Sequence, residues 1–248
     1  MSTAGSSQGT HSTPLGDSAA RETPLNAARE AILGRVRAAL GKNGADGAAV
    51  AEARKYIAAH AQGPRPKISA GLCARFLQRA TDMENTVETL ADRLAIPAAV
   101  ARYVNALDLP SALASQKSLR GVCWPEFADL DWTGAGLAIE ARPTRGDDRL
   151  GITGAFCAIA ETGTLVVLAG AESPTATTLL PDTHIAVLAA DRIVAGMEEA
   201  FALIRSERGA VPRAINLISG PSRTGDIEQT IVLGAHGPYR VHILVIGA

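Results

Sequence analysis

The chain has 248 residues, 47% of them hydrophobic, and its 24 Lys and Arg side chains nearly balance its 25 Asp and Glu. A chain of this length can bury a core without disulfides or structural metals, and a formal net charge of −1 gives the whole molecule no attraction to nucleic acid or to an anionic membrane. Its three cysteines, Cys73, Cys123 and Cys157, form no CxxC pair, which excludes a four-cysteine zinc or iron–sulfur site supplied by this chain alone.

The N-terminal part of the sequence differs in pattern from the rest. Residues 1–22 are polar and lack apolar periodicity, so we expect a disordered tail. They also lack the features of a signal peptide, and no apolar run is long enough for a membrane span, which predicts a cytoplasmic protein. Residues 23–66 predict two helices, NAAREAILGRVRAAL and AAVAEARKYIAAHA, and then the stiff connector GPRPK. We expect this helical segment to pack on the main domain or on a partner.

Residues 67–248 alternate between helical patterns and short runs of Val, Ile and Leu. Helices are predicted for SAGLCARFLQRATDM, IPAAVARYVNAL, RIVAGMEEAFALIRSE and DIEQTIVLG. Strands are predicted for TVETLA, LRGVCW, GLAIE, LGIT, TLVVLAG, HIAVLAA, AINLISG and RVHILVIG. Because such runs indicate strands covered on both faces, the pattern predicts an α/β domain with a mostly parallel sheet. Ligands of such sheets bind beyond the carboxyl ends of strands, which directs attention to the loops AIAETGT, AGAESPTATTLLPDTH, SGPSRTGD and GAHGP.

The first of these loops places Glu161 directly before Thr162 and Gly163. A carboxylate beside a flexible turn can act as a general base, as a covalent nucleophile or as a hydrogen-bond acceptor for a substrate hydroxyl. The structural alternative is that Glu161 accepts backbone N–H bonds within a tight turn and has no catalytic task. The sequence leaves both interpretations open.

The loop SGPSRTGD lies between an apolar run and the helical pattern of residues 226–232. A turn that opens onto a helix N-terminus offers backbone N–H groups to an anion, while Ser222 and Thr224 add hydroxyls and Arg223 can form a two-pronged pair. The loop matches neither the Walker pattern nor the dinucleotide fingerprint. The alternative interpretation is a capped helix start with a solvated arginine.

Histidines offer one further candidate. His236, in a glycine-flanked turn beside Gly237, is suited to acid–base chemistry or to contact with an anion, although the same residues suit a plain turn. His242 alternates with apolar residues in a strand and is expected to be a core or edge residue. His184 and Asp182 are too few ligands for a metal, so no metal site is predicted.

Two other loops are polar. The segment PTRGDDR, residues 143–149, is predicted to be a solvated loop, and a lid over an anionic ligand is the alternative. Ser173 and the threonines among residues 175–178 can line a pocket or belong to ordinary turns.

Taken together, the segments GAFCAIAETGTLVVLAG, TTLLPDTHIAVL, NLISGPSRTGDIEQTIVLGAHGP and RVHILVIGA resemble the LUD-domain family, in particular its lactate utilisation protein C type. Gly225 stands where members of that family typically have alanine. The resemblance implies a three-layer, Rossmann-like α/β fold of the sugar-phosphate isomerase and CoA-transferase type over residues 67–248.

The resemblance also implies a function. It suggests an accessory or substrate-handling subunit of an iron–sulfur system that oxidises L-lactate to pyruvate, with a small anion bound in a strand-end cleft. The iron–sulfur clusters are expected on partner subunits, with no cofactor in this chain, and a homo-oligomer stays possible. The alternatives are a stand-alone transferase or isomerase for a CoA ester or sugar phosphate, and a non-catalytic scaffold. By motif, the implied catalytic residues are Glu161 and His236, and the implied anion-binding residues are Thr162, Gly163, Ser222, Arg223, Thr224, Asp226, Glu228 and Gly237.

Overall fold

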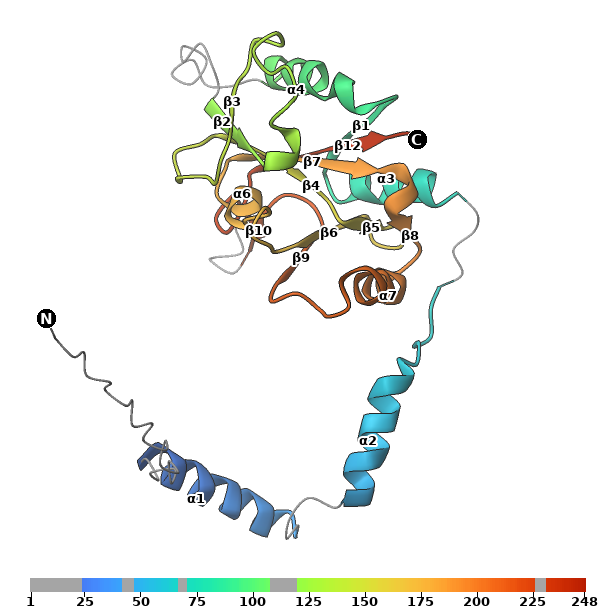
Figure 1. The fold of residues 1–248 in the computed structure, drawn as a ribbon, viewed down its shortest axis with the longest axis vertical. Helices are drawn as coiled ribbons and strands as arrows, with labels where there is room; N and C mark the ends of the chain where they lie inside the picture. Colours follow the sequence, from blue (N-terminus) through green and yellow to red (C-terminus); the bar gives the residue numbers. More distant parts are fainter. Residues whose placement is uncertain (1–23, 42–46, 67–70, 108–119, 226–230) are drawn as a thin grey trace, which may run out of the picture. The chain divides into compact units, whose positions relative to one another are not determined.

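The computed structural model describes residues 24–41, 47–66, 71–107, 120–225 and 231–248 (Figure 1). The expected N-terminal tail lies outside these residues. The chain divides into two compact units, residues 1–63 and 64–248. Within the described ranges, no helix has the length and apolar character needed to cross a membrane.

The first unit contains the two helices that the sequence predicts, α1 (Pro24–Ala39) and α2 (Gly47–Ala59). On α1, Ile32 and Val36 lie one helical turn apart, and both are about half exposed. No residue of α2 is buried. The periodic pattern therefore predicts these helices correctly. Their large apolar side chains are largely exposed to solvent within the described part of this unit.

A six-stranded sheet forms the centre of the second unit (Figure 1). Its order is β1-β12-β7-β4-β2-β3, and every neighbouring pair is parallel. The strands are β1 (Thr86–Leu90), β2 (Arg120–Cys123), β3 (Ala138–Ala141), β4 (Leu150–Gly154), β7 (Thr183–Ala189) and β12 (Arg240–Ile246). The predicted α/β class with a mostly parallel sheet is confirmed.

Helices cover both faces of this sheet. Leu244 of β12 belongs to the hydrophobic cluster that contains α4 (Ile96–Asn105), whereas Ile243 and Val245 belong to the cluster that contains α3 (Leu72–Asp82). Because successive residues of a strand point to opposite faces, α4 and α3 lie on opposite sides of the sheet.

A second, four-stranded sheet packs on the same side as α3. Its order is β8-β5-β6-β9, formed by β5 (Cys157–Ile159), β6 (Thr164–Leu168), β8 (Ile193–Val194) and β9 (Ile215–Ile218). Its other face is covered by α7 (Met197–Arg208) through Ala200 and Ile204. The sequence pattern assigns TLVVLAG and AINLISG to the parallel sheet, but β6 pairs antiparallel with β5 and β9. A tight turn returns β5 directly to β6, and only antiparallel strands can be joined in this way.

The segment after β9 also differs from its prediction. Arg223 and Thr224 form β10, which pairs antiparallel with β11 (Val232–Leu233). The expected helix over residues 226–232 therefore does not include Val232, and residues 226–230 lie outside the described residues. Backbone bonds from Ser222 N to Pro238 O and from Gly234 N to Ser222 O hold this segment in a hairpin-like arrangement. Arg223 and Thr224 are therefore strand residues, and Ser222, directly before them, belongs to no helix.

The loop PTRGDDR is more ordered than a solvated loop. The side chain of Asp148 is 2% exposed and accepts bonds of 2.9 and 2.7 Å from the guanidinium of Arg142. The Thr144 hydroxyl and the Arg145 backbone N–H also donate to Asp148. A buried carboxylate with four donors fixes the loop against the end of the sheet.

Candidate functional site

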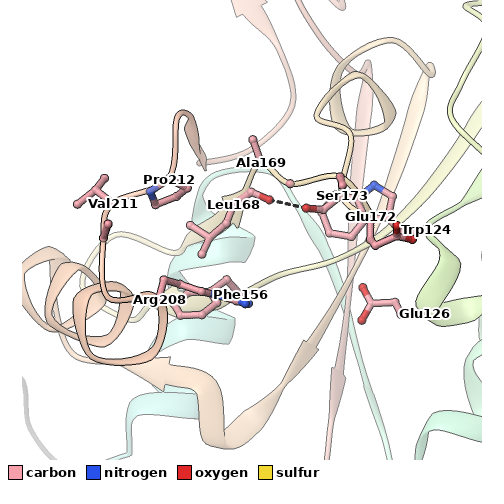
Figure 2. Close-up of a pocket in the computed structure, with 13 residues that line it drawn as sticks. Trp124, Glu126, Phe156, Leu168, Ala169, Glu172, Ser173, Arg208, Val211 and Pro212 are labelled. Carbon is pink, nitrogen blue, oxygen red and sulfur yellow. Dashed lines mark hydrogen bonds between the residues drawn. The ribbon is translucent and has the colours of Figure 1, made fainter. Parts of the chain in front are cut away.

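A pocket of about 650 Å³ opens at the carboxyl ends of β2 and β4 (Figure 2). Trp124 directly follows β2, and Phe156 lies just after β4. From β2 the chain continues to β3 on one side, whereas from β4 it continues toward β7 on the other, so the strand order reverses between β2 and β4. Open α/β sheets bind ligands at such a reversal. The topology and the pocket therefore identify the same place.

Glu126 is one of the two carboxylates that line this pocket, the other being Glu172. It lies on the 3₁₀ helix Pro125–Phe127, and its carboxyl group packs against Gly154, where a Cβ atom would come within 2.3 Å of Glu126 Oε1. Although the residue is exposed overall, this packing removes water from the carboxyl group and raises its pKa. A bond from Gly154 N–H and the charge of Arg93 oppose the rise. Glu126 therefore keeps a proton at a higher pH than an ordinary glutamate.

The other end of the pocket carries positive charge. Two guanidinium groups lie near the ring of Phe156, Arg192 at 4.7 Å and Arg208 at 5.4 Å from its centroid. Arg192 is engaged, since it pairs with Glu207 through bonds of 2.6 and 3.0 Å. For Arg208, no ion pair is found among the residues that the structure describes. Arg208 is thus the cation that an anion in the pocket can meet.

The segment after β6 forms the remaining wall. Ser173 lines the pocket, and its hydroxyl donates to Leu168 O at 2.9 Å, which closes the loop. Glu172, on the same loop, is exposed. Figure 2 shows Glu126 and Trp124 at one end of the pocket and Arg208, Val211 and Pro212 at the other. The pocket thus combines aromatic and apolar walls with a few polar groups, the usual composition of a small-molecule site.

The sequence-predicted residues Thr162 and Gly163 lie in the turn between β5 and β6. Thr162 and Thr164 share a hydroxyl–hydroxyl bond of 2.6 Å, and Thr164 makes another of 2.6 Å with Ser219 at the end of β9. Gly163 has a φ of 70°, and a Cβ atom there would lie 2.5 Å from the backbone N of Ala80 in α3. The structure therefore gives Gly163 a packing role against that helix.

Glu161 lies beside the start of α7. A Cβ atom at Gly196 would lie 3.2 Å from Glu161 Oε2 and 2.3 Å from Arg65 Nη2, which places both side chains at the same glycine. Arg65 also pairs with Glu198 and Glu199. Glu161 therefore belongs to an acidic group around Arg65.

Ser222, His236 and Gly237 come together in a different turn. The backbone N–H of His236 donates to Ser222 Oγ at 3.2 Å, and a Cβ atom at Gly237 would lie 3.4 Å from Ser222 Cβ. The His236 side chain is exposed, and Arg223 pairs with Glu84.

Thr224 belongs to β10, whereas Asp226 and Glu228 lie outside the described residues. In the described part of the chain, no hydrogen bond or ion pair joins Glu161 to Arg223 or His236. The structure thus distributes the predicted site residues over two groups, and the strand-end pocket is lined by neither.

The pocket residues Glu126 and Arg208 are absent from the sequence-based candidates. One signal could have found Glu126, since the segment WPEF directly follows the predicted strand LRGVC, where the strand-end rule applies. Arg208 gives no such signal, because a basic residue in the last turn of a helix is common.

The residues that the structure describes do not suit a cluster or metal bound by this chain alone. Cys123 and Cys157 are buried in two different hydrophobic clusters, and Cys73 packs against a third. Burial raises the pKa of both Cys123 and Cys157 to about 11, which disfavours the thiolate that a metal needs. Across the described ranges, no three His, Cys, Asp or Glu side chains lie close enough together to hold a metal ion.

Comparison with known proteins adds family information. Residues 126–246 match the model of the LUD domain, a range that begins at Glu126 and includes Arg208. Lactate utilization protein C of Bacillus licheniformis is 31% identical over 127 residues, which are 50% of this chain and 53% of that protein. Lactate utilization protein C of Geobacillus sp. (strain WCH70) is 39% identical over 100 residues, which are 39% of this chain and 42% of that protein. The matched part of the chain spans about half the length of these curated relatives.

A solved structure shares the fold. The crystal structure of a DUF162 family protein from Deinococcus radiodurans superposes with a TM-score of 0.50. The match covers 73% of this chain and 100% of that chain at 23% sequence identity. At this identity the similarity concerns the fold alone.

Proposed function

Since residues 126–246 of this chain match the model of the LUD domain, we propose that the protein works in lactate utilisation as an accessory, substrate-handling subunit. Support comes from the relatives of this domain that carry the name lactate utilization protein C. The pocket at the carboxyl ends of β2 and β4 is where we propose that the small organic anion binds.

One observation carries this proposal: Arg208 and Glu126 lie in the same pocket, at the point where the strand order reverses. Lactate has a carboxylate, a hydroxyl and a methyl group. Arg208 offers a two-pronged partner for the carboxylate. Phe156, whose ring centroid lies 5.4 Å from the Arg208 guanidinium, offers an apolar surface to the methyl group. Glu126, at the other end of the pocket (Figure 2), acts on the bound anion through its charge.

The proposal assigns binding of the anion to this chain and electron transfer to partner subunits. Oxidation of lactate to pyruvate needs an acceptor for electrons as well as for protons. The cysteines of this chain lie in three separate clusters, which does not suit an iron–sulfur centre here. We therefore place the iron–sulfur clusters on the partners, and we expect the purified chain alone not to oxidise lactate.

The Arg208→Gln substitution tests the anion contact. We expect the full chain to bind L-lactate and pyruvate with chemical-shift changes confined to the residues of the pocket. Loss of a charged hydrogen-bond partner should weaken this binding about tenfold or more, measured by NMR titration or calorimetry. The matched control is Arg205→Gln on the same helix, outside the pocket, which should bind as the unsubstituted chain does. Equal binding by the two variants, or shifts elsewhere on the surface, would contradict the proposal.

The pH dependence of lactate binding tests Glu126. The pKa of its carboxyl group is raised, so the protonated, hydrogen-bond-donating form persists to higher pH than usual. As the pH rises through that pKa, the carboxylate that forms repels an anionic ligand, and binding should weaken. The charge that acts directly on Glu126 is Arg93, and the other charged residues that line the pocket are Glu172 and Arg208. Glu126→Gln should bind lactate without this pH step. An unchanged pH profile in that variant would remove Glu126 from the site.

A further inference from the structure

A second pocket, of about 490 Å³, lies at the opposite edge of the six-stranded sheet. Thr86 and Arg240, the first residues of β1 and β12, line it, so it opens at the amino ends of these strands. Its walls are largely apolar and come from residues far apart in the sequence: Ala106, Leu107, Pro221, Leu233 and Val241. Its polar groups come from Glu84, Thr86, Tyr103, Tyr239 and Arg240.

Tyr103 is held in place at this pocket by two contacts. Its ring stacks on the buried ring of His242, with the centroids 4.0 Å apart and the planes 11° from parallel. Its hydroxyl hydrogen-bonds with Thr86, whose Oγ1 atom is 2.8 Å from His242 Nδ1. Fixed second-layer contacts of this kind are typical of side chains that must keep a defined position toward a ligand.

The hydrogen-bond chain has a direction. Burial lowers the pKa of His242 to about 4, so the ring is neutral and carries one N–H group. His242 Nε2 is buried without a hydrogen-bond partner and lies 3.9 Å from Glu88 Oε2, whereas Nδ1 lies against Thr86. An unpaired buried acceptor costs less than an unpaired buried N–H, so we assign the proton to Nδ1. His242 then donates to Thr86. The single hydroxyl proton of Thr86 has two acceptors, Val241 O at 3.5 Å and the Tyr103 oxygen, and when it lies on the Tyr103 oxygen the Tyr103 O–H donates into the pocket.

Arg240 supplies the positive charge of this pocket. Its guanidinium lies 4.7 Å from the centroid of the Tyr239 ring, and its charge acts on the Tyr103 hydroxyl by lowering the pKa of that group against the larger effect of burial. In the part of the chain that the structure describes, no ion pair engages Arg240. The carboxylate of the lining, Glu84, is paired with Arg223. The pocket therefore presents both a cation and a hydroxyl group to a ligand.

We propose that this pocket is a second binding site, for an organic acid with an apolar body larger than lactate. Arg240 and the Tyr103 O–H bind its carboxylate. Its body packs against the apolar walls, among them Leu107 and Leu233. Apolar walls with a few convergent polar groups are the usual composition of a small-molecule pocket. The site lies at the opposite sheet edge from the lactate pocket and does not depend on it.

Benzoate is the probe that tests this site, and benzamide is its uncharged control of similar shape. With the full chain, NMR titration should show benzoate shifting the resonances around Thr86 and Arg240, with much weaker binding of benzamide. Arg240→Gln and Tyr103→Phe should each weaken benzoate binding about tenfold or more, because each removes one partner of a charged hydrogen bond. Tyr103→Phe keeps the ring that stacks on His242, and Arg75→Gln, on the exposed side of α3, is the control that should bind normally.

Equal binding of benzamide and benzoate, or unchanged binding by both variants, would overturn the proposal. Benzoate that is displaced by L-lactate and weakened by Arg208→Gln would also overturn it, because the probe would then lie in the other pocket. Failure of the protein to bind lactate would contradict the proposed function and leave the benzoate result unaffected.

Discussion

Replacing Gly163 by alanine is expected to lower the free energy of unfolding by about 2–4 kcal/mol, a sum of backbone strain and of overpacking against α3. The φ of 70° at this residue lies in the left-handed region, which costs an L-residue with a side chain about 1 kcal/mol. The added Cβ atom would also lie 2.5 Å from Ala80 N and 2.5 Å from Arg79 C. These are backbone atoms of α3, next to its buried residue Ala80, so relieving the clash requires a shift of the helix.

The control for Gly163→Ala separates these two contributions. Gly136 has a φ of 76°, but no heavy atom lies within 4 Å of the position that a Cβ atom would take there. Gly136→Ala should therefore lose only about 1 kcal/mol, the backbone contribution alone. Urea denaturation of both variants gives the comparison. Equal losses would show that the β5–β6 turn is not packed against α3 as the structure has it.

The sequence predicts the local elements of the fold better than their partners. The apolar spacing of IPAAVARYVNAL, with Pro97 in the first turn, predicts α4, and Pro97 does lie at its start. The run TLVVLAG predicts a strand but cannot say with which strand it pairs. Leu165 and Val167 of β6 pair with residues of β9, far along the chain, so the second sheet depends on contacts that a local pattern does not record.

In the candidate site, too, the sequence predicts local features better than the contacts between distant residues. The motif ETGT marks a real junction, because Thr164 bonds to Ser219 and Gly163 packs on α3. The close packing of this turn against α3 explains its small residues. An anion-binding loop requires small residues too, so the sequence alone cannot distinguish the two roles. Glu126 and Arg208 line the same pocket because of the order of the strands in the sheet, in which β2 and β4 are neighbours, and no sequence motif marks them.

Replacing Asp148 by alanine is expected to destabilise the protein by about 3 kcal/mol, because it leaves the guanidinium of Arg142 without its main partner. The side chains of Asp148 and Arg142 are only 2% and 15% exposed, so water cannot replace the lost bonds well. The matched control is Asp182→Ala, which breaks the ion pair between Asp182 and Arg149. The side chain of Asp182 is 47% exposed and that of Arg149 is 48% exposed. Exposed pairs contribute about 1 kcal/mol or less, so urea denaturation should separate the two variants clearly.

The same carboxylate should make stability depend on acid pH. The bonds from Arg142 hold the pKa of Asp148 at about 2, below its ordinary value of 3.8. The stabilisation from the ionised form is complete above the ordinary value and is lost as the pH falls through about 2. Asp148→Asn should therefore show less acid destabilisation between these values, in unfolding measured against pH. If Asp148→Asn keeps the acid dependence of the unsubstituted chain, the loop is not held by this carboxylate. It would then be free to act as the lid that the sequence also allows.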